Sequence, residues 1–439
     1  MKHFFHLLGF DREKHSVRTE VVAGLTTFIT MAYILAVNPA MFADLGNVLG
    51  PEHGMPVGAQ FTATTLAAAF GCLMMAFLAK KPFGLAPGMG LNAFFIYTVC
   101  IGMHYSWQFA LTAVFIEGII FIILSVTKVR DMLVKAIPPQ LGSAISVGIG
   151  LFIAYLGLVN CGFITAGANG LALGDLSAPS TLLAIVGFVI TASLLVCGMQ
   201  GALLVGMLIT ALIGVPFGLI KLEGVVSMPE SIAPIFCQFE WNRIFSYDML
   251  IVVFTFLFMD IFDTMGTVIG LSVKTDMVDK DGNVDRLSQL FTSDALATTA
   301  GACFGTSTTT TLVESAAGVA AGGRTGLTAF VIAICFLLAL FFSPLFLSIT
   351  GSVTGPVLVL IGVMMCSPIS KIEWDRYTEA IPAFVTMFIM PTTGSISNGI
   401  MFGVITYVLL NLVVHGWKSC NITMYILAVV FLLKFIFVA

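Results

Sequence analysis

Five acidic residues lie inside long apolar stretches of this 439-residue chain. They are Glu117, Asp260, Asp263, Asp294 and Glu314. An ionised carboxylate within a lipid-embedded segment is costly, so acids at such positions are typical of substrate pathways and proton relays. A carboxylate also accepts hydrogen bonds from the N–H groups of a ligand. Ligand binding and proton transfer are therefore the chemistry that these five positions predict.

The closest pair in the sequence is Asp260 and Asp263, which are three residues apart and share one face of a helix. Two carboxylates held this near each other in a low dielectric should not both ionise readily. The pair therefore suits a site that takes up and releases a proton. The alternative is that these carboxyls cap the ends of broken helices.

Glu314 lies at the centre of residues 304–324, which also interrupt an apolar region. The first half of this stretch is rich in threonine, and the second half is rich in glycine and alanine. This order predicts an extended segment followed by a half-helix, with Thr311 and Glu314 forming a capping box at the helix start. Such a break survives in lipid only where protein buries it or a cavity hydrates it.

Composition places the rest of the chain in a membrane. Hydrophobic residues make up 58% of the sequence and charged residues 10%, with a mean hydropathy of +1.04. A net charge of -4 argues against a nucleic-acid partner. We count fourteen apolar segments. With the N-terminus in the cytoplasm, sixteen of the 19 Lys and Arg residues fall in cytoplasmic ends and loops, Lys221 and Arg243 fall outside, and Lys434 lies in the apolar stretch of the tail. Both termini are therefore expected in the cytoplasm of a multi-pass protein of the inner (plasma) membrane.

The two halves of the chain resemble each other at two broken spans. Residues 83–92, in the third apolar segment, and residues 304–314, in the tenth, both begin with Phe-Gly and end at a polar residue, Asn92 or Glu314. Seven segments separate the two breaks, which is an odd number, so the halves are expected in opposite orientations. Paired broken spans in inverted halves mark the midplane site of a transporter. The sequence thus predicts an all-α membrane protein with 14 transmembrane segments in two inverted 7-span repeats.

Five regions follow from this prediction. They are a cytoplasmic N-terminus (1–20), a first repeat (21–221), an external loop (222–248), a second repeat (249–414) and a cytoplasmic tail with an interfacial helix (415–439).

The remaining candidate residues have more than one interpretation. Asp294 opens a predicted span, so N-capping or helix packing competes with a functional role. Glu117 has no evident partner in the sequence, and a neutral, hydrogen-bonded structural carboxyl is expected there. Asn92 is either a turn residue or a ligand, and its position opposite Glu314 in the repeat favours the ligand role.

A pocket of carboxyls and one amide without a basic residue disfavours an anion. It suits a neutral heterocycle whose ring N–H and amino groups donate to carboxylates. Guanine offers two such donors on one edge, and hypoxanthine offers one. Their acceptor atoms would face backbone N–H groups that the broken spans leave free.

At these residues the sequence resembles the nucleobase–cation symporters, specifically the AzgA-like adenine/guanine/hypoxanthine permeases. The matching stretches lie in the family's order along nearly the whole chain, at residues 20–33, 85–95, 262–267 and 314–326. The resemblance implies two inverted seven-span repeats, divided between a core and a gate domain. It also implies proton-coupled purine uptake by a homodimer in which the core moves like an elevator.

The resemblance also implies roles for individual residues. Asp260, Glu314 and Asn92 match substrate ligands, and Asp263 matches the proton-coupling group. Asp294 matches a recurring acid without a clear role. Some adenine-preferring members lack the acid at the position of Asp260. The presence of Asp260 therefore favours guanine and hypoxanthine as the expected substrates.

The sequence disfavours three alternatives to a purine transporter. An anion transporter of the related inverted-repeat fold is disfavoured, since carboxylates at the half-helices would repel the anion. A membrane-embedded enzyme acting on purines is disfavoured, because the sequence holds no metal-ligand motif or nucleophile–base pattern. A channel is disfavoured, because a proton-binding carboxylate beside a substrate ligand implies coupled transport rather than passive flow. We expect no enzyme activity, metal or cofactor, and the proton gradient as the energy source.

Overall fold

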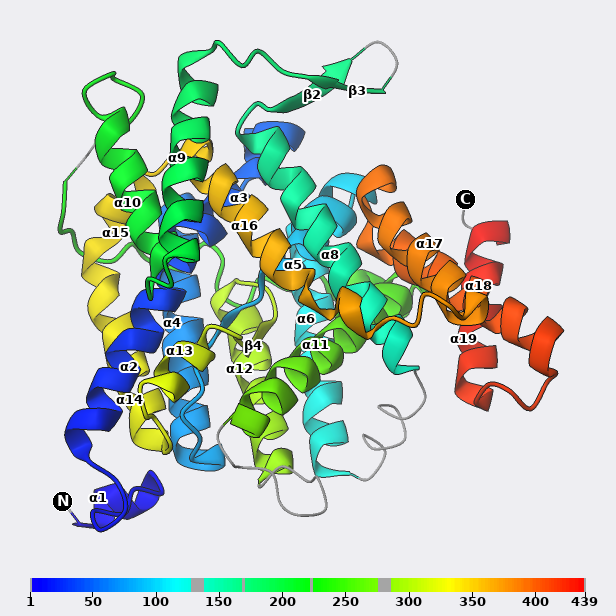
Figure 1. Ribbon diagram of the computed structural model, residues 1–439, viewed down its shortest axis with the longest axis horizontal. Helices are drawn as coiled ribbons and strands as arrows, with labels where there is room; N and C mark the ends of the chain where they lie inside the picture. Colours follow the sequence, from blue (N-terminus) through cyan, green and yellow to red (C-terminus); the bar gives the residue numbers. More distant parts are fainter. Residues whose placement is uncertain (1, 128–137, 168–169, 222–223, 275–285, 438–439) are drawn as a thin grey trace. The chain divides into compact units, whose positions relative to one another are not determined.

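The computed structural model describes residues 2–127, 138–167, 170–221, 224–274 and 286–437 (Figure 1). The chain divides into two compact units, which are described separately. Unit 1 comprises Met1–Thr127 and Val159–Val357, and unit 2 comprises Lys128–Leu158 and Leu358–Ala439.

Unit 1 contains most of the helices and all of the short strands. The helices are α1 (Lys2–Leu7), α2 (Val17–Met31), α3 (Ile34–Leu49), α4 (Val57–Met74), α5 (Met89–Ala93), α6 (Trp107–Val126), α9 (Pro179–Val196), α10 (Ala202–Gly214), α11 (Tyr247–Lys274), α12 (Leu287–Phe304), α13 (Ser315–Ala320), α14 (Gly326–Ala339) and α15 (Ser343–Leu347). The strands are β1 (Leu85–Pro87), β2 (Ile164–Gly167), β3 (Gly170–Leu173) and β4 (Thr309–Thr311). Two π-helical segments, η2 (Met75–Ala79) and η3 (Phe94–Gly102), continue α4 and α5, and three 3₁₀ turns are η1 (Pro51–His53), η4 (Trp241–Arg243) and η5 (Leu340–Phe342).

Unit 2 is built from helices alone in its described part. They are α8 (Pro139–Asn160), whose last two residues belong to unit 1, α17 (Tyr377–Thr393), α18 (Ile396–His415), α19 (Ile422–Phe437) and the 3₁₀ turn η6 (Ser367–Lys371). The helix α16 (Gly351–Met365) begins in unit 1 and ends in unit 2. Gly150 and Gly362 let two backbones of unit 2 approach, since a Cβ on Gly150 would lie 2.7 Å from the Gly362 carbonyl oxygen. Small residues at such crossings are typical of helix packing in membranes.

Eight helical stretches in the described residues are long and apolar enough to cross a membrane. They are Val17–Leu49, Pro51–Ala79, Trp107–Val126, Pro139–Asn160, Pro179–Val196, Gly326–Leu347, Gly351–Lys371 and Ile396–His415. Shorter apolar helices include Met89–Gly102 and Ala202–Gly214. A mainly helical membrane architecture is thus confirmed, and the count of fourteen stays a prediction.

The two predicted breaks meet at the centre of unit 1. Strands β1 and β4 pair antiparallel, with Ala86 opposite Thr310, although more than two hundred residues separate them. Each strand is followed directly by a helix, α5 after β1 and α13 after β4. The β-branched threonines of β4 favour the extended backbone. The predicted order of extended segment and half-helix is therefore confirmed at both breaks.

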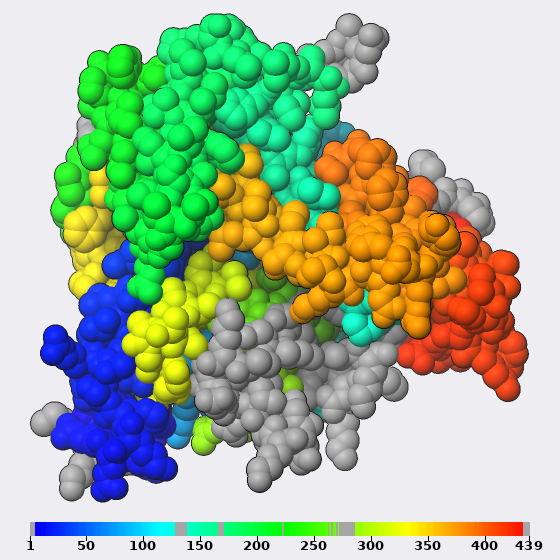
Figure 2. All heavy atoms as spheres, viewed as in Figure 1, coloured from blue at the N-terminus to red at the C-terminus, as the bar shows by residue number. Residues whose placement is uncertain are grey.

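Long-range contacts bring the ends of unit 1 together around this strand pair. The helix α6 packs against both α11 and α12, and α11 and α12 each contact β4 (Figure 1). The N-terminal helix α2 packs on α13 and α14, and Figure 2 shows these blue and yellow segments side by side.

Candidate functional site

All six polar residues singled out by the sequence lie in unit 1, on five elements that surround the strand pair. Asp260 and Asp263 are on α11, Glu117 is on α6 and Asp294 is on α12. Glu314 precedes α13, and Asn92 is on α5. The structure divides the five acids into two groups, each with its own surroundings.

The first group, which we call the inner acid cluster, consists of Glu117, Asp260 and Asp294. All three residues have 0% of their surface exposed. The carboxyl groups of Glu117 and Asp260 lie in hydrogen-bonding position, and both also interact electrostatically with Asp294. The other Glu117 oxygen, Oε2, accepts a hydrogen bond from Thr308 at 3.3 Å. Three carboxyls from three helices therefore occupy one buried volume.

Asp294 ties α12 to both neighbouring elements. Its carboxylate accepts hydrogen bonds from the hydroxyl of Thr264 on α11 and from that of Thr311 on β4, the latter at 3.2 Å. Of the alternatives for Asp294, N-capping does not hold, because α12 begins at Leu287, about two turns earlier. The helix-packing alternative describes what this residue does here.

The second group, which we call the half-buried pair, consists of Asp263 and Glu314. Both side chains are partly exposed. They interact electrostatically with each other. Tyr33, at the break between α2 and α3, donates a hydrogen bond from Oη to Glu314 Oε1 at 2.7 Å. The two acids on α11 therefore have different main partners: Asp260 interacts with Asp294 and Glu117, whereas Asp263 interacts with Glu314.

The capping box predicted for Thr311 and Glu314 is wrong. Glu314 occupies the N-cap position of α13, but its side chain makes no capping hydrogen bond. The Thr311 hydroxyl donates to Asp294 instead. The spacing of Thr311 and Glu314 in the sequence does not reveal their tertiary partners. Thr311 bonds to Asp294 and Glu314 bonds to Tyr33, so neither side chain caps the helix.

Asn92 is the centre of a buried amide and hydroxyl network. Its Nδ2 donates to Asn38 Oδ1 at 2.5 Å, and its Oδ1 accepts from the Ser307 hydroxyl. Asn38 in turn donates to Thr64 at 2.6 Å and to Thr306 at 3.3 Å. The network joins α3, α4 and α5 to the segment before β4. Asn92 Nδ2 carries two N–H groups, and after one donates to Asn38 the other can donate to a ligand.

Four of these partners were missed by reasoning from sequence: Tyr33, Asn38, Thr264 and Thr308. Tyr33 ends the first stretch of family resemblance, which was the one available signal for it. Asn38 lies in an apolar span and could have been found by the rule that singled out the acids, since an uncharged amide at membrane depth also needs partners. Thr264 lies within the stretch of family resemblance at residues 262–267, which was its one signal. Thr308 had no signal of its own, because it is one of several hydroxyls in a threonine-rich run.

Close helix packing holds Glu314 next to Tyr33. A Cβ on Gly318 of α13 would lie 2.6 Å from the carbonyl oxygen of Ala23 and closer still to the Thr27 hydroxyl. We expect Gly318→Ala to cost about 1–3 kcal/mol of stability through overpacking. The thermal unfolding of the purified protein in detergent measures this. Gly46→Ala on α3 is the control, since its Cβ would meet its nearest atom at 3.4 Å; equal unfolding temperatures for both variants would contradict the close contact.

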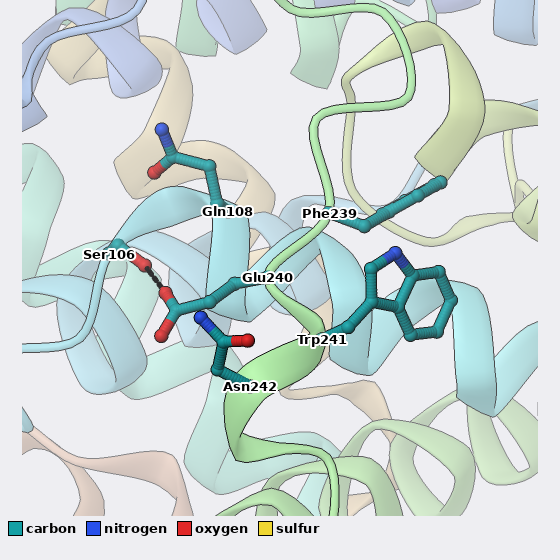
Figure 3. Close-up of a pocket in the computed structure, with 6 residues that line it drawn as sticks. All are labelled: Ser106, Gln108, Phe239, Glu240, Trp241 and Asn242. Atoms are coloured by element: carbon teal, nitrogen blue, oxygen red, sulfur yellow. Dashed lines mark hydrogen bonds between the residues drawn. The ribbon is translucent and has the colours of Figure 1, made fainter.

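A separate pocket of about 490 Å³ opens at the start of α6 (Figure 3). It is lined by Ser106, Gln108, Phe239, Glu240, Trp241 and Asn242, and Ser106 donates to Glu240 at 2.5 Å. Nearby, Tyr105 donates to Asp248 at 2.5 Å, and burial together with this carboxylate raises the pKa of Tyr105 to about 12. None of the six predicted site residues lines this pocket. Its contacts fasten the segment before α11 to α6.

The electrostatics of the acid groups are those of a site without cations. The ion pairs found among the described residues involve none of the five acids. No set of three or more His, Cys, Asp and Glu side chains in the described part of the chain is arranged to hold a metal ion. Uncompensated carboxylates at this depth are costly unless they bind a proton or a hydrogen-bond donor.

Comparison with known proteins identifies the family. The sequence profile described as "Permease family" (Xan_ur_permease) matches residues 18–402. The chain belongs to this permease family. The permease is 44% identical to the guanine/hypoxanthine permease PbuG of Bacillus subtilis, with 100% of each chain covered. It is 38% identical to the adenine permease AdeQ of Escherichia coli over 96% of this chain and 94% of that one.

The permease shares its fold with a solved transporter of low sequence identity. The transmembrane domain of the cyanobacterial bicarbonate transporter BicA matches with a TM-score of 0.65 at 16% identity, covering 87% of this chain and 97% of the other. Because permeases are transport proteins, the expectation of a transporter rather than an enzyme is confirmed, as is the recognised resemblance to purine permeases.

Proposed function

We propose that the permease takes up purine nucleobases together with protons. The observation that carries this proposal is that five acids lie around two paired broken spans. None of these acids forms an ion pair with a basic side chain among the described residues. Such a site repels anions, accepts N–H donors and binds protons. The names of the related guanine/hypoxanthine and adenine permeases support a purine as the donor.

Glu314 and Asp260 are proposed as the acceptors for purine N–H groups. Glu314 is partly exposed and already oriented by Tyr33, so it can meet the ligand first. Asp260 is fully buried, so its contact with a purine requires local opening around α11. Asn92 contributes its remaining N–H to a ring or carbonyl acceptor. Guanine and hypoxanthine are favoured, and adenine remains a candidate.

Asp263 is proposed as the proton-coupling group. It interacts with Glu314, so its charge affects the ligand site directly, and it is partly exposed, so a proton can reach it. When Asp263 is protonated, the repulsion on Glu314 disappears and a purine can bind. No cofactor or metal is needed in this scheme, because the proton gradient supplies the energy.

The wider organisation is proposed to follow the sequence analysis. It comprises fourteen spans in two inverted repeats (21–221 and 249–414), an external loop at 222–248, and cytoplasmic ends at 1–20 and 415–439. The helix α19 within the tail is proposed to lie at the membrane interface. Transport by alternating access of a core against a gate, in a homodimer of the inner membrane, completes the proposal.

Uptake of radiolabelled hypoxanthine into proteoliposomes tests the coupling. We expect accumulation when the lumen is made alkaline relative to the outside, and loss of accumulation when a protonophore is added. Unlabelled guanine and adenine should compete, whereas bicarbonate should not. Accumulation that persists with the protonophore would refute proton coupling. Competition by bicarbonate would favour the alternative of an anion transporter.

A further inference from the structure

Glu117 takes no part in the proposed substrate contacts, yet it is fully buried beside Asp260, which is a proposed substrate ligand. It lies on α6, and its neighbour Gly118 brings α6 close to α12, since a Cβ there would lie 2.9 Å from the backbone nitrogen of Thr299. The carboxyl group of Glu117 itself lies in hydrogen-bonding position to that of Asp260 on α11. The position requires an explanation, because an unpaired buried carboxylate is strongly destabilising.

The hydrogen bonding of this pair is incomplete without a proton. Both oxygens of Asp260 and Oε1 of Glu117 are buried, and none has a donor among the described residues. Thr308 supplies only Oε2 of Glu117. A carboxylate accepts hydrogen bonds but cannot donate one, whereas a protonated carboxyl donates. One proton placed between Glu117 and Asp260 therefore converts two facing acceptors into a hydrogen-bonded pair.

Every charged group around the pair favours that proton. On α12 the facing group is Asp294, on α11 it is Asp263, and the segment before β4 contributes only the neutral hydroxyl of Thr308. The hydroxyls of Thr264 and Thr311 serve Asp294 and do not reach the pair. The described surroundings thus add negative charge and hydroxyls, and none of the interactions described for the pair is with a basic group.

We propose that Glu117 and Asp260 share one proton, and that Glu117 is a positioning residue for the substrate-binding carboxylate of Asp260. The shared proton forms a site distinct from the coupling group Asp263. When a purine donates to one Asp260 oxygen, the proton resides on Glu117, which donates to the other oxygen. Asp260 then remains charged and fixed in orientation while bound to the ligand. This second role rests on the proposed function, whereas the shared proton does not.

Infrared spectroscopy of the purified, purine-free permease tests the shared proton. We expect a carbonyl band of a buried protonated carboxyl that shifts in heavy water. Glu117→Gln and Asp260→Asn should each remove the same band, because the amide replaces the protonated partner as a permanent donor to the remaining carboxylate. Asp263→Asn is the matched control and should leave this band in place. A band that persists in either of the first two variants would overturn the proposal.

Purine affinity tests the positioning role in the same proteins. Glu117→Ala removes the donor, whereas Glu117→Gln keeps one, so we expect the alanine variant to bind hypoxanthine at least about tenfold more weakly than the glutamine variant. Equal affinities in two well-folded variants would contradict positioning by a donor. If the wild-type permease binds no purine, the proposed function fails, and the infrared result still decides whether the proton is shared.

Discussion

Replacing Glu314 or Asp260 by alanine is expected to abolish purine uptake at equal expression. Each change removes an acceptor for a purine N–H group in a site shielded from water, and removing one partner of such a charged hydrogen bond costs about 2–5 kcal/mol. This corresponds to at least about a 30-fold loss of binding. Initial uptake of labelled hypoxanthine by cells and binding to purified protein both measure the effect.

Controls separate the loss of a ligand from the loss of the fold. Glu52→Ala removes an exposed acid whose only ion pair is with its neighbour His53 at 3.7 Å among the described residues, and uptake should be unchanged. Tyr33→Phe keeps the Glu314 carboxylate but removes its 2.7 Å hydrogen bond. An intermediate loss, of about tenfold, is expected for it. Wild-type uptake by both Glu314→Ala and Asp260→Ala would refute the site assignment.

The sequence predicts the broken spans well because they depend on local chemistry. Pro87 and the surrounding glycines disfavour a continuous helix, and Thr309–Thr311 favour an extended backbone, so each break is encoded where it occurs. The internal resemblance of the two halves then places both breaks in corresponding positions. Their pairing as β1 and β4 is a tertiary contact that neither segment reveals alone.

The pairing of acids could not be predicted in the same way. Helical periodicity places Asp260 and Asp263 on one face of α11, which suggested that they affect each other most. Tertiary packing instead presents Glu117 from α6 to Asp260, and Glu314 to Asp263. Partners that come from another helix leave no trace in local spacing. The same reason explains the failure of the capping box, since Thr311 is drawn to Asp294 on α12.

The division of the acids also suggests how binding and coupling are separated. In the inner acid cluster all three acids are fully buried, and Glu117 and Asp294 accept hydrogen bonds from threonines, so the cluster is suited to retain a proton. The half-buried pair is open enough to exchange a proton with water. Asp260 and Asp263 are less than one helical turn apart, so a movement of α11 that admits a purine to Asp260 also changes the surroundings of Asp263. This short connection is a physical route by which ligand and proton influence each other.

Asp263→Asn is expected to bind purine and to exchange it across the membrane without concentrating it. Asparagine is neutral at every pH, so it mimics the protonated state and leaves Glu314 free of repulsion, but it cannot release the proton inside the cell. Driven by a gradient of one pH unit, a carrier that moves one proton per purine can accumulate its substrate about tenfold, since one unit is worth about 1.4 kcal/mol. The variant should reach an accumulation ratio of about one.

Two measurements in proteoliposomes test this expectation. Exchange of internal unlabelled for external labelled hypoxanthine shows whether the variant still binds and moves its substrate. Uptake of labelled hypoxanthine under an imposed pH gradient then measures accumulation. An accumulation ratio equal to that of the wild type would remove Asp263 from the coupling step and shift that role to another acid of the site.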